Sequence, residues 1–543
     1  MRHSFRSVLI FLISAGCFFL QGCFPNKTAH MAEKDGLEEF LTELRKDATP
    51  HNATFFNSSK IFTRDGCIYL FPEGFSVSSD TLMGQGGRYT FGNETGQAGW
   101  YAIPRDSIIA LTYYEEKHTF GEILGTGLLG AYGGLMSYGA IACLSCPKCC
   151  FGSCPTVYVE SDSISGIRAE CFSYCVSPFV QRPDLDLLLR DADASQPFRM
   201  RVTNEALESH FLNRLELLAV SHPADSRIYP TAEGRVVAVR HLAPVRNAHA
   251  EEGVDIGELL RAADENAWRS GPDRFADFTD RGKRDAVTFE VPTTLDRDSI
   301  TLVLRARNTL LTTALFYDVV LGSRGLNALE WTARMAKDES YARFFYALYD
   351  QYAGLQVEVE RGGRFVLVSS VGDIGPIAWK DFAVRIPASD GITRVRLSFF
   401  PDNIALDYIA YARETLDDGA FTVSAVPPTS VEDSWNRSRP ELLADIARQD
   451  ERYVHSTPGD SFLFSYTLPR SAGMTTSVLL RSQGYYYEWL RGNWVRNENV
   501  LPPLNIFDVP GILHDLRSRW LSDSRVMEDE FFRNRVPLKE RRP

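Results

Sequence analysis

The stretch TRVRLSFF at residues 393–400 alternates between polar and apolar side chains. Successive side chains of an extended strand point to opposite faces, so the apolar residues share one face: Val395, Leu397 and Phe399. The polar residues share the other face: Arg394, Arg396 and Ser398. This pattern predicts a β-strand with one buried face and one face in water.

Neighbouring segments within residues 284–412 repeat this alternation: VTFEV (287–291), ITLVLRAR (300–307), LQVEVE (355–360), RFVLVSS (364–370) and FAVRIP (382–387). Two glycines within 360–364 predict a hairpin loop. Apolar residues at helical spacing predict an inserted helix over 328–352, with one stripe made of Trp331, Met335, Ala342, Phe345 and Tyr352. Residues 284–412 are therefore predicted to form a β-sandwich.

The strand pattern of 284–412 resembles the galactose-binding-like jelly rolls of extracellular proteins. The resemblance rests on the alternation in segments such as TRVRLSFF and FAVRIP. It implies a jelly-roll-like sandwich with an inserted helix, in a protein that works outside the cytoplasm.

The remaining segments indicate a mainly β, multi-domain protein with α+β elements. At about 150 residues per domain, 543 residues predict three or four domains. Short apolar runs predict a short helix and a small β domain over 36–118, and a cysteine-rich β region over 148–250. A more polar stretch over 251–283 predicts a partly helical linker, and 413–543 is predicted to be an α+β segment with a basic tail.

The N-terminus carries an export signal. Two arginines precede an uncharged, mostly apolar run from Val8 to Leu20, which is too short to span a bilayer. The run ends in Leu20-Gln21-Gly22-Cys23, which resembles the lipobox of bacterial lipoproteins. The resemblance implies a signal peptide over 1–22, acylation of Cys23 (palmitate) and a tether over 23–35. Phe24 after the cysteine implies the outer membrane, so the expected partner of this end is a membrane.

A glycine-rich hydrophobic segment occupies 119–147. From Ile123 to Pro147 there is no charged residue, and Gly130 and Gly134 form a GxxxG pair. The length and the small-residue spacing are typical of a membrane helix, whereas the glycine content lowers helix propensity. The sequence leaves two alternatives: the segment contacts a membrane, or it forms a buried glycine-rich helix or hairpin.

Eight cysteines remain after the signal peptide and the acylated residue: Cys67, Cys143, Cys146, Cys149, Cys150, Cys154, Cys171 and Cys175. In an exported chain an even number of cysteines favours disulfides, with pairings that the sequence does not reveal. The string CLSCPKCCFGSCP (143–155) also resembles a ferredoxin cluster motif with one extra cysteine, and it could make a thiolate zinc site or a redox-active pair.

The sequence shows no catalytic signature. It has no HExxH, GxSxG or phosphate-loop motif, and the single GxGxxG (125–130) lies within the glycine-rich run. The pairs Asp184/Asp186 and Asp191/Asp193 could contribute to a calcium site or form solvated turns. We therefore predict no catalytic residue, no metal and no cofactor. The net charge of −12 argues against nucleic acid as a partner.

The strand-like run GYYYEWLRGNW (484–494) places Tyr485, Tyr487 and Trp489 on one face. Exposed rings on a strand could stack on sugars, so these three residues are the predicted ligand platform, although strand aromatics are also typical core residues. The sequence favours a lipid-anchored envelope protein with a non-catalytic structural or binding role, toward a glycan or a protein. The alternative is an envelope hydrolase such as a glycosidase, whose two carboxylates need not be close in sequence.

Overall fold

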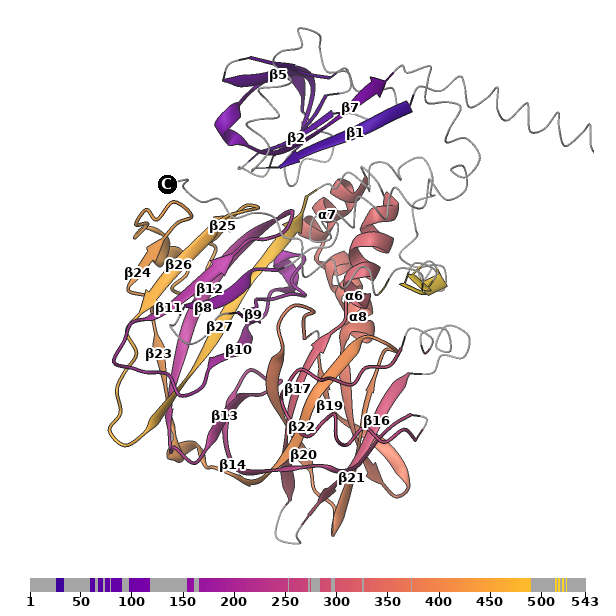
Figure 1. Ribbon diagram of the computed structural model, residues 1–543, viewed down its shortest axis with the longest axis vertical. Coiled ribbons are helices and arrows are strands. Elements are labelled where there is room, and N and C mark those ends of the chain that lie inside the picture. Colours follow the sequence, from indigo (N-terminus) through magenta and orange to yellow (C-terminus); the bar gives the residue numbers. More distant parts are fainter. Residues whose placement is uncertain are drawn as a thin grey trace, which may run out of the picture. The chain divides into compact units, whose positions relative to one another are not determined.

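The computed structural model describes residues 26–33, 59–117, 154–160 and 166–489, apart from short gaps, and several residues between 513 and 524 (Figure 1). The chain divides into two units, residues 1–145 and 146–543. Antiparallel strands dominate both units, which confirms the prediction of a mainly β, multi-domain protein.

The first unit is built on one antiparallel sheet. Its strands are β1 (Asn26–Glu33), β2 (Ser59–Thr63), β3 (Ile68–Phe71), β4 (Ser76–Val77), β5 (Thr81–Tyr89), β6 (Gln97–Pro104) and β7 (Ile108–Lys117). In the sheet they follow the order β1-β7-β2-β3-β5-β4, and β6 also pairs with β5. Leu82, Ile103 and Leu111 lie in its core beside Phe71. A Cβ at Gly86 would lie 1.9 Å from the carbonyl oxygen of Leu70, so this crossing of β3 and β5 requires glycine.

Strand β1 overturns part of the predicted tether. Residues 26–33 pair with β7 in continuous register, from Asn26 opposite Lys117 to Glu33 opposite Ala110. Only two residues, Phe24 and Pro25, therefore separate Cys23 from the first strand in the sequence. The sequence did not reveal this strand, because NKTAHMAE has no regular alternation of apolar and polar residues.

The second unit contains two sandwiches. In the first sandwich, the strands of one sheet are β10 (Asp184–Leu189), β27 (Thr475–Glu488), β12 (Glu208–His222), β23 (Thr422–Val426) and β25 (Val454–Ser456). Their order in the sheet is β10-β27-β12-β23, and β25 also pairs with β12. The facing sheet is β24 (Ser430–Glu432), β26 (Ser461–Tyr466), β11 (Phe198–Thr203), β8 (Thr156–Glu160) and β9 (Ile167–Glu170). Side chains such as Met200, Leu215 and Phe464 fill the space between them.

The second sandwich also has two five-stranded sheets. One is β13 (Arg227–Pro230), β14 (Val236–Pro244), β22 (Ile404–Thr415), β17 (Ser299–Asn308) and β20 (Lys380–Pro387). The other is β15 (Arg246–Ala250), β16 (Asp285–Pro292), β21 (Ile392–Phe399), β18 (Leu355–Arg361) and β19 (Arg364–Val371). Every predicted strand of 284–412 is present, and Gly362 and Gly363 turn the β18–β19 hairpin with positive φ.

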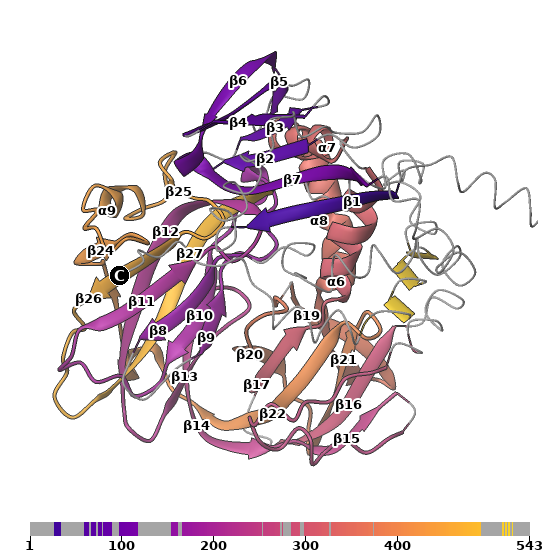
Figure 2. The same ribbon diagram turned by 45° about the horizontal axis from the view of Figure 1, so that its top comes forward.

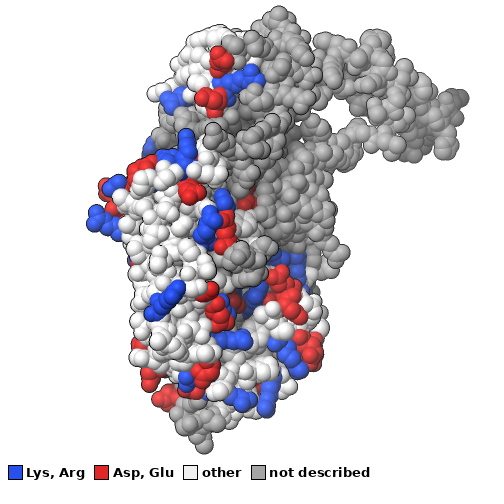
Figure 3. Space-filling model, turned by 60° about the vertical axis from the view of Figure 1, so that its left-hand side comes forward, with Lys and Arg blue, Asp and Glu red and all other residues white. Residues whose placement is uncertain are grey.

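The outer face of β21 is charged, as its alternation predicts. Arg394 lies 3.2 Å from Glu290 on β16, and Arg396 lies 2.6 Å from Glu358 on β18. Figure 3 shows the same mixing of basic and acidic side chains over the described part of one face of the molecule.

The two sandwiches are nested in the chain. The second sandwich is formed by 227–415 and lies in sequence between β12 and β23 of the first. The segment 148–250 consequently supplies strands to both sandwiches, and strands from 413–543 complete the first one. Apolar residues of both sandwiches meet in one cluster, which includes Leu218 and Leu479 from the first and Ile228 and Ala238 from the second.

Helices fill the connection between β17 and β18: α6 (Leu311–Thr313), the π-helical η3 (Ala314–Leu321), the short η4 (Gly322–Arg324), α7 (Asn327–Lys337) and α8 (Glu339–Ala353). The single predicted helix over 328–352 is thus two helices. The chain breaks at Asp338, whose carboxylate accepts the backbone N–H of Tyr341 and caps α8. The predicted stripe is buried at Trp331, Met335, Ala342 and Phe345, while Tyr352 is half-buried.

Figures 1 and 2 place α6 and α8 at one end of the second sandwich, beside β27 of the first. Among the helices that the structure describes, none has the length and apolar character needed to cross a membrane. The glycine-rich segment 119–147 lies outside the described residues.

Candidate functional site

An aromatic pocket lies where α8 and η3 meet the first sandwich. Seven aromatic side chains line it: Tyr174, Phe316, Tyr317, Phe345, Tyr346, Tyr349 and Tyr486. The remaining lining residues are Cys154, Glu170, Ser173, Val176, Thr313 and Pro376. A mostly aromatic lining with a few converging polar groups is typical of a small-molecule site.

Three kinds of local structure bring these rings together. Tyr486 comes from β27, where it lies on the opposite face of the strand from Tyr485 and Tyr487. Phe345, Tyr346 and Tyr349 follow one side of α8, with ring centroids of Phe345 and Tyr349 6.3 Å apart. Phe316 and Tyr317 come from η3, and a π-helical turn is rare and frequent at functional sites.

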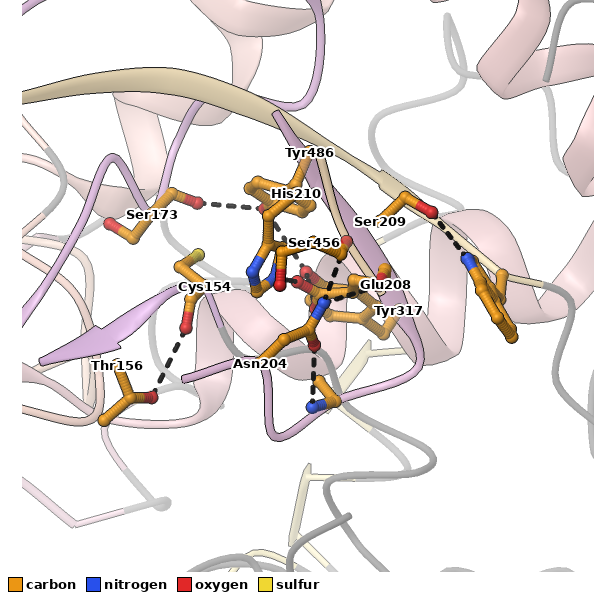
Figure 4. Close-up of polar contacts among 12 residues, drawn as sticks. Cys154, Thr156, Ser173, Asn204, Glu208, Ser209, His210, Tyr317, Ser456 and Tyr486 are labelled. Atoms are coloured by element: carbon orange, nitrogen blue, oxygen red, sulfur yellow. Dashed lines mark hydrogen bonds and ion pairs between the residues drawn. The ribbon is translucent and has the colours of Figure 1, made fainter. Parts of the chain in front are cut away.

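A buried polar cluster lies behind the pocket (Figure 4). The hydroxyl oxygen of Tyr317 lies 3.2 Å from that of Tyr486 and 3.5 Å from Glu208 Oε1. The Tyr486 hydroxyl donates to the carbonyl of Ser173 at 2.9 Å, and His210 Nε2 lies 3.0 Å from Glu208 Oε2. Burial raises the pKa of both tyrosines well above its usual range, so both are neutral hydrogen-bonding groups.

Among the described residues that line the pocket, Glu170 is the one carboxylate. Its Oε2 accepts the backbone N–H of Ile377 at 2.9 Å, and a Cβ at Gly375 would lie 2.6 Å from the same oxygen. The loop at 375–377 therefore holds this carboxylate in place. Glycoside hydrolysis uses two carboxylates on either side of the bond to be cleaved, and this lining supplies one.

The enclosed space of the pocket is small. Its volume is about 20 Å³, which holds about one water molecule. A larger ligand would enter only if aromatic side chains of the lining move; Tyr346 and Tyr349 on α8 are half-buried.

The predicted aromatic platform does not form as an open face. Trp489 is fully buried, with its indole N–H donating to Ser209 Oγ at 2.9 Å, and Tyr487 is only 8% exposed. Tyr485 is half-buried, but its ring stacks on Phe211 of β12 at 4.6 Å and 8°. Parallel rings this close cover one another's faces, so the three predicted residues pack against the protein instead of presenting a surface to a sugar.

Sequence reasoning missed the partners of this stack. Phe211 lies opposite Tyr485 in the register of β12 and β27, and opposite His455 of β25, whose ring stacks on it at 4.9 Å. Cross-strand neighbours stabilise a sheet, but they are far apart in sequence and no local pattern shows them.

The described cysteines are buried. Cys154 lines the pocket, Cys171 and Cys175 lie in the core of the first sandwich, and Cys67 accepts a hydrogen bond from Arg88 at 3.1 Å. Burial raises the pKa of the Cys171 thiol, which keeps it protonated and unreactive. No disulfide joins two of these four residues.

The rest of the cysteine cluster lies outside the described residues: Cys143, Cys146, Cys149 and Cys150, together with Cys23. Disulfides in that part of the chain stay a prediction. Within the described part, no group of histidine, cysteine, aspartate and glutamate side chains is arranged to hold a metal ion.

Asp184 and Asp186 are neither a calcium site nor a solvated turn. Both are buried on β10 of the first sandwich, and Lys380 from β20 of the second sandwich places Nζ 2.5 Å from Asp184 Oδ1 and 3.0 Å from Asp186 Oδ1. Burial, together with the charge of Asp184, raises the pKa of Asp186 to about 7. Arg190 and Asp381 form a second ion pair at this junction, at 3.3 Å.

One serine–histidine contact resembles the nucleophile and base of a hydrolase. Ser477 Oγ lies 2.9 Å from His222 Nε2, and Ser226 Oγ lies 3.0 Å from Nδ1. Ser477 is 1% exposed and burial lowers the pKa of His222, so a substrate has no access to this pair. The contact ties the ends of β12 and β27 together.

Comparisons with known proteins assign no family. No family model matches the chain, and no curated protein does. Solved structures with some likeness include an isomalto-dextranase from Arthrobacter globiformis (11% identity, 42% of this chain and 36% of that one, TM-score 0.16). Another is the cycloalternan-forming enzyme from Listeria monocytogenes (11% identity, 64% and 31%, TM-score 0.15). The tandem carbohydrate-binding modules of a Streptococcus pneumoniae family 98 glycoside hydrolase are a third (7% identity, 46% and 100%, TM-score 0.13).

The chain spans about a third of the length of the first two of these proteins. TM-scores at this level carry no argument about the fold or the function of this chain.

Proposed function

We propose that this chain is a lipid-anchored envelope protein with a non-catalytic binding role, and that its aromatic pocket receives a sugar unit of an envelope glycan. The observation that carries the proposal is the pocket lining, in which seven rings surround one fixed carboxylate. Aromatic faces pack against the C–H faces of a sugar ring, and a carboxylate with hydroxyl groups accepts and donates hydrogen bonds to sugar hydroxyls.

The acid–base groups near the pocket support binding over hydrolysis. Glu208, Glu488 and His210 are buried behind the rings, where a sugar bond does not reach them, and Glu170 is the one carboxylate in the part of the lining that the structure describes. Hydrolysis would need a second carboxylate facing the same sugar. A glycosidase therefore has less support than a binding role.

Replacing Tyr349 by alanine is expected to weaken sugar binding at least about tenfold, which corresponds to about 1.4 kcal/mol, because the variant loses a stacking ring of the lining. The probe is a panel of oligosaccharides released by mild acid from purified envelopes, measured by isothermal titration calorimetry. Phe344→Ala is the matched control, because Phe344 lies on the same helix and is 44% exposed.

Equal sugar affinity of wild type and Tyr349→Ala would show that the aromatic pocket does not bind the sugar. Release of smaller sugars by the purified wild-type protein would replace the binding role with a hydrolase.

Replacing Cys23 by alanine is expected to abolish fatty-acid labelling of the mature protein. Support for this comes from the apolar run that ends in LQGC at residues 20–23. Labelling with radioactive palmitate, followed by electrophoresis, measures the effect, and Cys67→Ala is the control because that cysteine is buried in the first unit. Undiminished labelling of Cys23→Ala would rule out the anchor.

A further inference from the structure

The lipid anchor and the first strand are too close together for the first unit to stand away from a membrane. β1 begins at Asn26, three residues after Cys23, and it is paired to β7 from that first residue. An extended chain spans at most about 3.6 Å per residue, so an acylated Cys23 can be no more than about 11 Å along the chain from the first residue of the sheet. This reach is comparable to the thickness of one polar headgroup layer, which is roughly 5–8 Å.

Trp100 is the side chain of the first unit best suited to meet that headgroup layer. It lies on β6 and is 67% exposed, although tryptophan is a large, mainly apolar side chain. Its cross-strand partner on β5 is the exposed Gln85. Tryptophan is enriched at membrane–water interfaces, because its ring is apolar and its indole N–H stays hydrogen-bonded near the headgroups.

On the face that carries Trp100, the described residues of β5 and β6 are all uncharged. On the same face of β6 the neighbours are Ala98 and Ala102, which lie opposite Gly87 and Met83 of β5. Small side chains let the tryptophan protrude, and a face without charges meets a bilayer without stripping water from an ion. We call this surface, which consists of Ala98, Trp100 and Ala102 of β6 and Met83, Gln85 and Gly87 of β5, the Trp100 face.

We propose that the first unit docks through the Trp100 face onto the bilayer that holds its lipid anchor. The partner is a phospholipid surface, and the inference rests on the proposed acylation of Cys23. A single tryptophan binds a membrane weakly, but the short link from the anchor holds the face at a high effective concentration near the surface.

The test uses the full-length protein purified with its anchor and reconstituted in phosphatidylethanolamine/phosphatidylglycerol vesicles, with and without bromine atoms on the acyl chains. Mass spectrometry first establishes that Cys23 carries acyl chains. Bromine quenches tryptophan fluorescence only at short range, and the chain has eight tryptophans, so the difference between wild type and Trp100→Phe isolates Trp100. Trp435→Phe is the control, since Trp435 lies in the second unit beside Arg437.

We expect quenching in wild type that falls by at least half in Trp100→Phe and is unchanged in Trp435→Phe. Equal quenching in wild type and Trp100→Phe, or none in wild type, would overturn the docking while leaving the anchor intact. An unmodified Cys23 would overturn both the anchor and the docking. Circular dichroism of Trp100→Phe verifies that the exposed substitution leaves the fold unchanged.

Discussion

Replacing Lys380 by methionine is expected to lower the free energy of unfolding of the second unit by about 3–5 kcal/mol at neutral pH. The ammonium group of Lys380 lies within 3.0 Å of both Asp184 and Asp186, and both aspartates are buried. Removing it leaves the buried Asp184 and Asp186 without a cationic partner for the negative charge that they carry. Methionine keeps the unbranched stem of lysine up to the position of Cε, so the loss measures mainly the charge and not a cavity.

Urea unfolding followed by circular dichroism measures this effect, with Lys337→Met as the control because Lys337 is exposed at the end of α7. The deficit of Lys380→Met is expected to shrink as the pH falls toward 5, since protonation of the aspartates removes their charge. A deficit no larger than that of the control would show that Lys380 does not compensate the two aspartates.

The second unit is also expected to lose stability as the pH rises from 5 to 8, through Asp186. The pKa of its carboxyl is about 7 in the folded protein, raised from the ordinary value of 3.8 by burial and then by the charge of Asp184. The folded state therefore holds a proton that the unfolded state releases, and the stabilisation is complete below pH 3.8 and lost as the pH passes through 7. The full change is on the order of 4 kcal/mol.

Asp186→Asn should flatten this dependence and be more stable than wild type at pH 8, because the amide is neutral throughout. Melting temperatures at pH 5, 6, 7 and 8 measure the slope. Burial also raises the pKa of Asp285 and Asp407, so the informative quantity is the difference in slope between wild type and variant. Asp193→Asn, at an exposed position whose pKa is lowered, should keep the wild-type slope. Identical slopes for Asp186→Asn and wild type would show that the raised pKa of Asp186 does not cause the pH dependence of stability.

Local alternation predicted the second sandwich well. Val395, Leu397 and Phe399 are fully buried, as their spacing in TRVRLSFF requires, and Arg394 and Arg396 find acidic partners on neighbouring strands. These properties depend on residues two apart in one strand, which the sequence shows directly.

Features built from distant segments were not predictable in this way. Lys380 meets Asp184 across 196 positions of the chain, and the pocket joins β9, η3, α8 and β27. The error over Trp489 has the same origin: this residue directly follows the end of β27, and it is buried with its indole N–H donating to Ser209, a residue 280 positions away in the chain. Periodicity gives the two faces of a strand, and only the tertiary fold decides which of them meets water.

The nested arrangement of the two sandwiches constrains the order in which the chain can fold. Strand β12 (Glu208–His222) needs β27 (Thr475–Glu488) as its neighbour, and the whole second sandwich is threaded between them. During synthesis the inner sandwich is complete before β27 is made and can close, while β12 still lacks this partner for the part of the strand that carries Leu212, Leu215 and Leu217. Long-range pairing of this kind is slow, so the newly made chain has an interval in which a holding chaperone would protect that strand from aggregation.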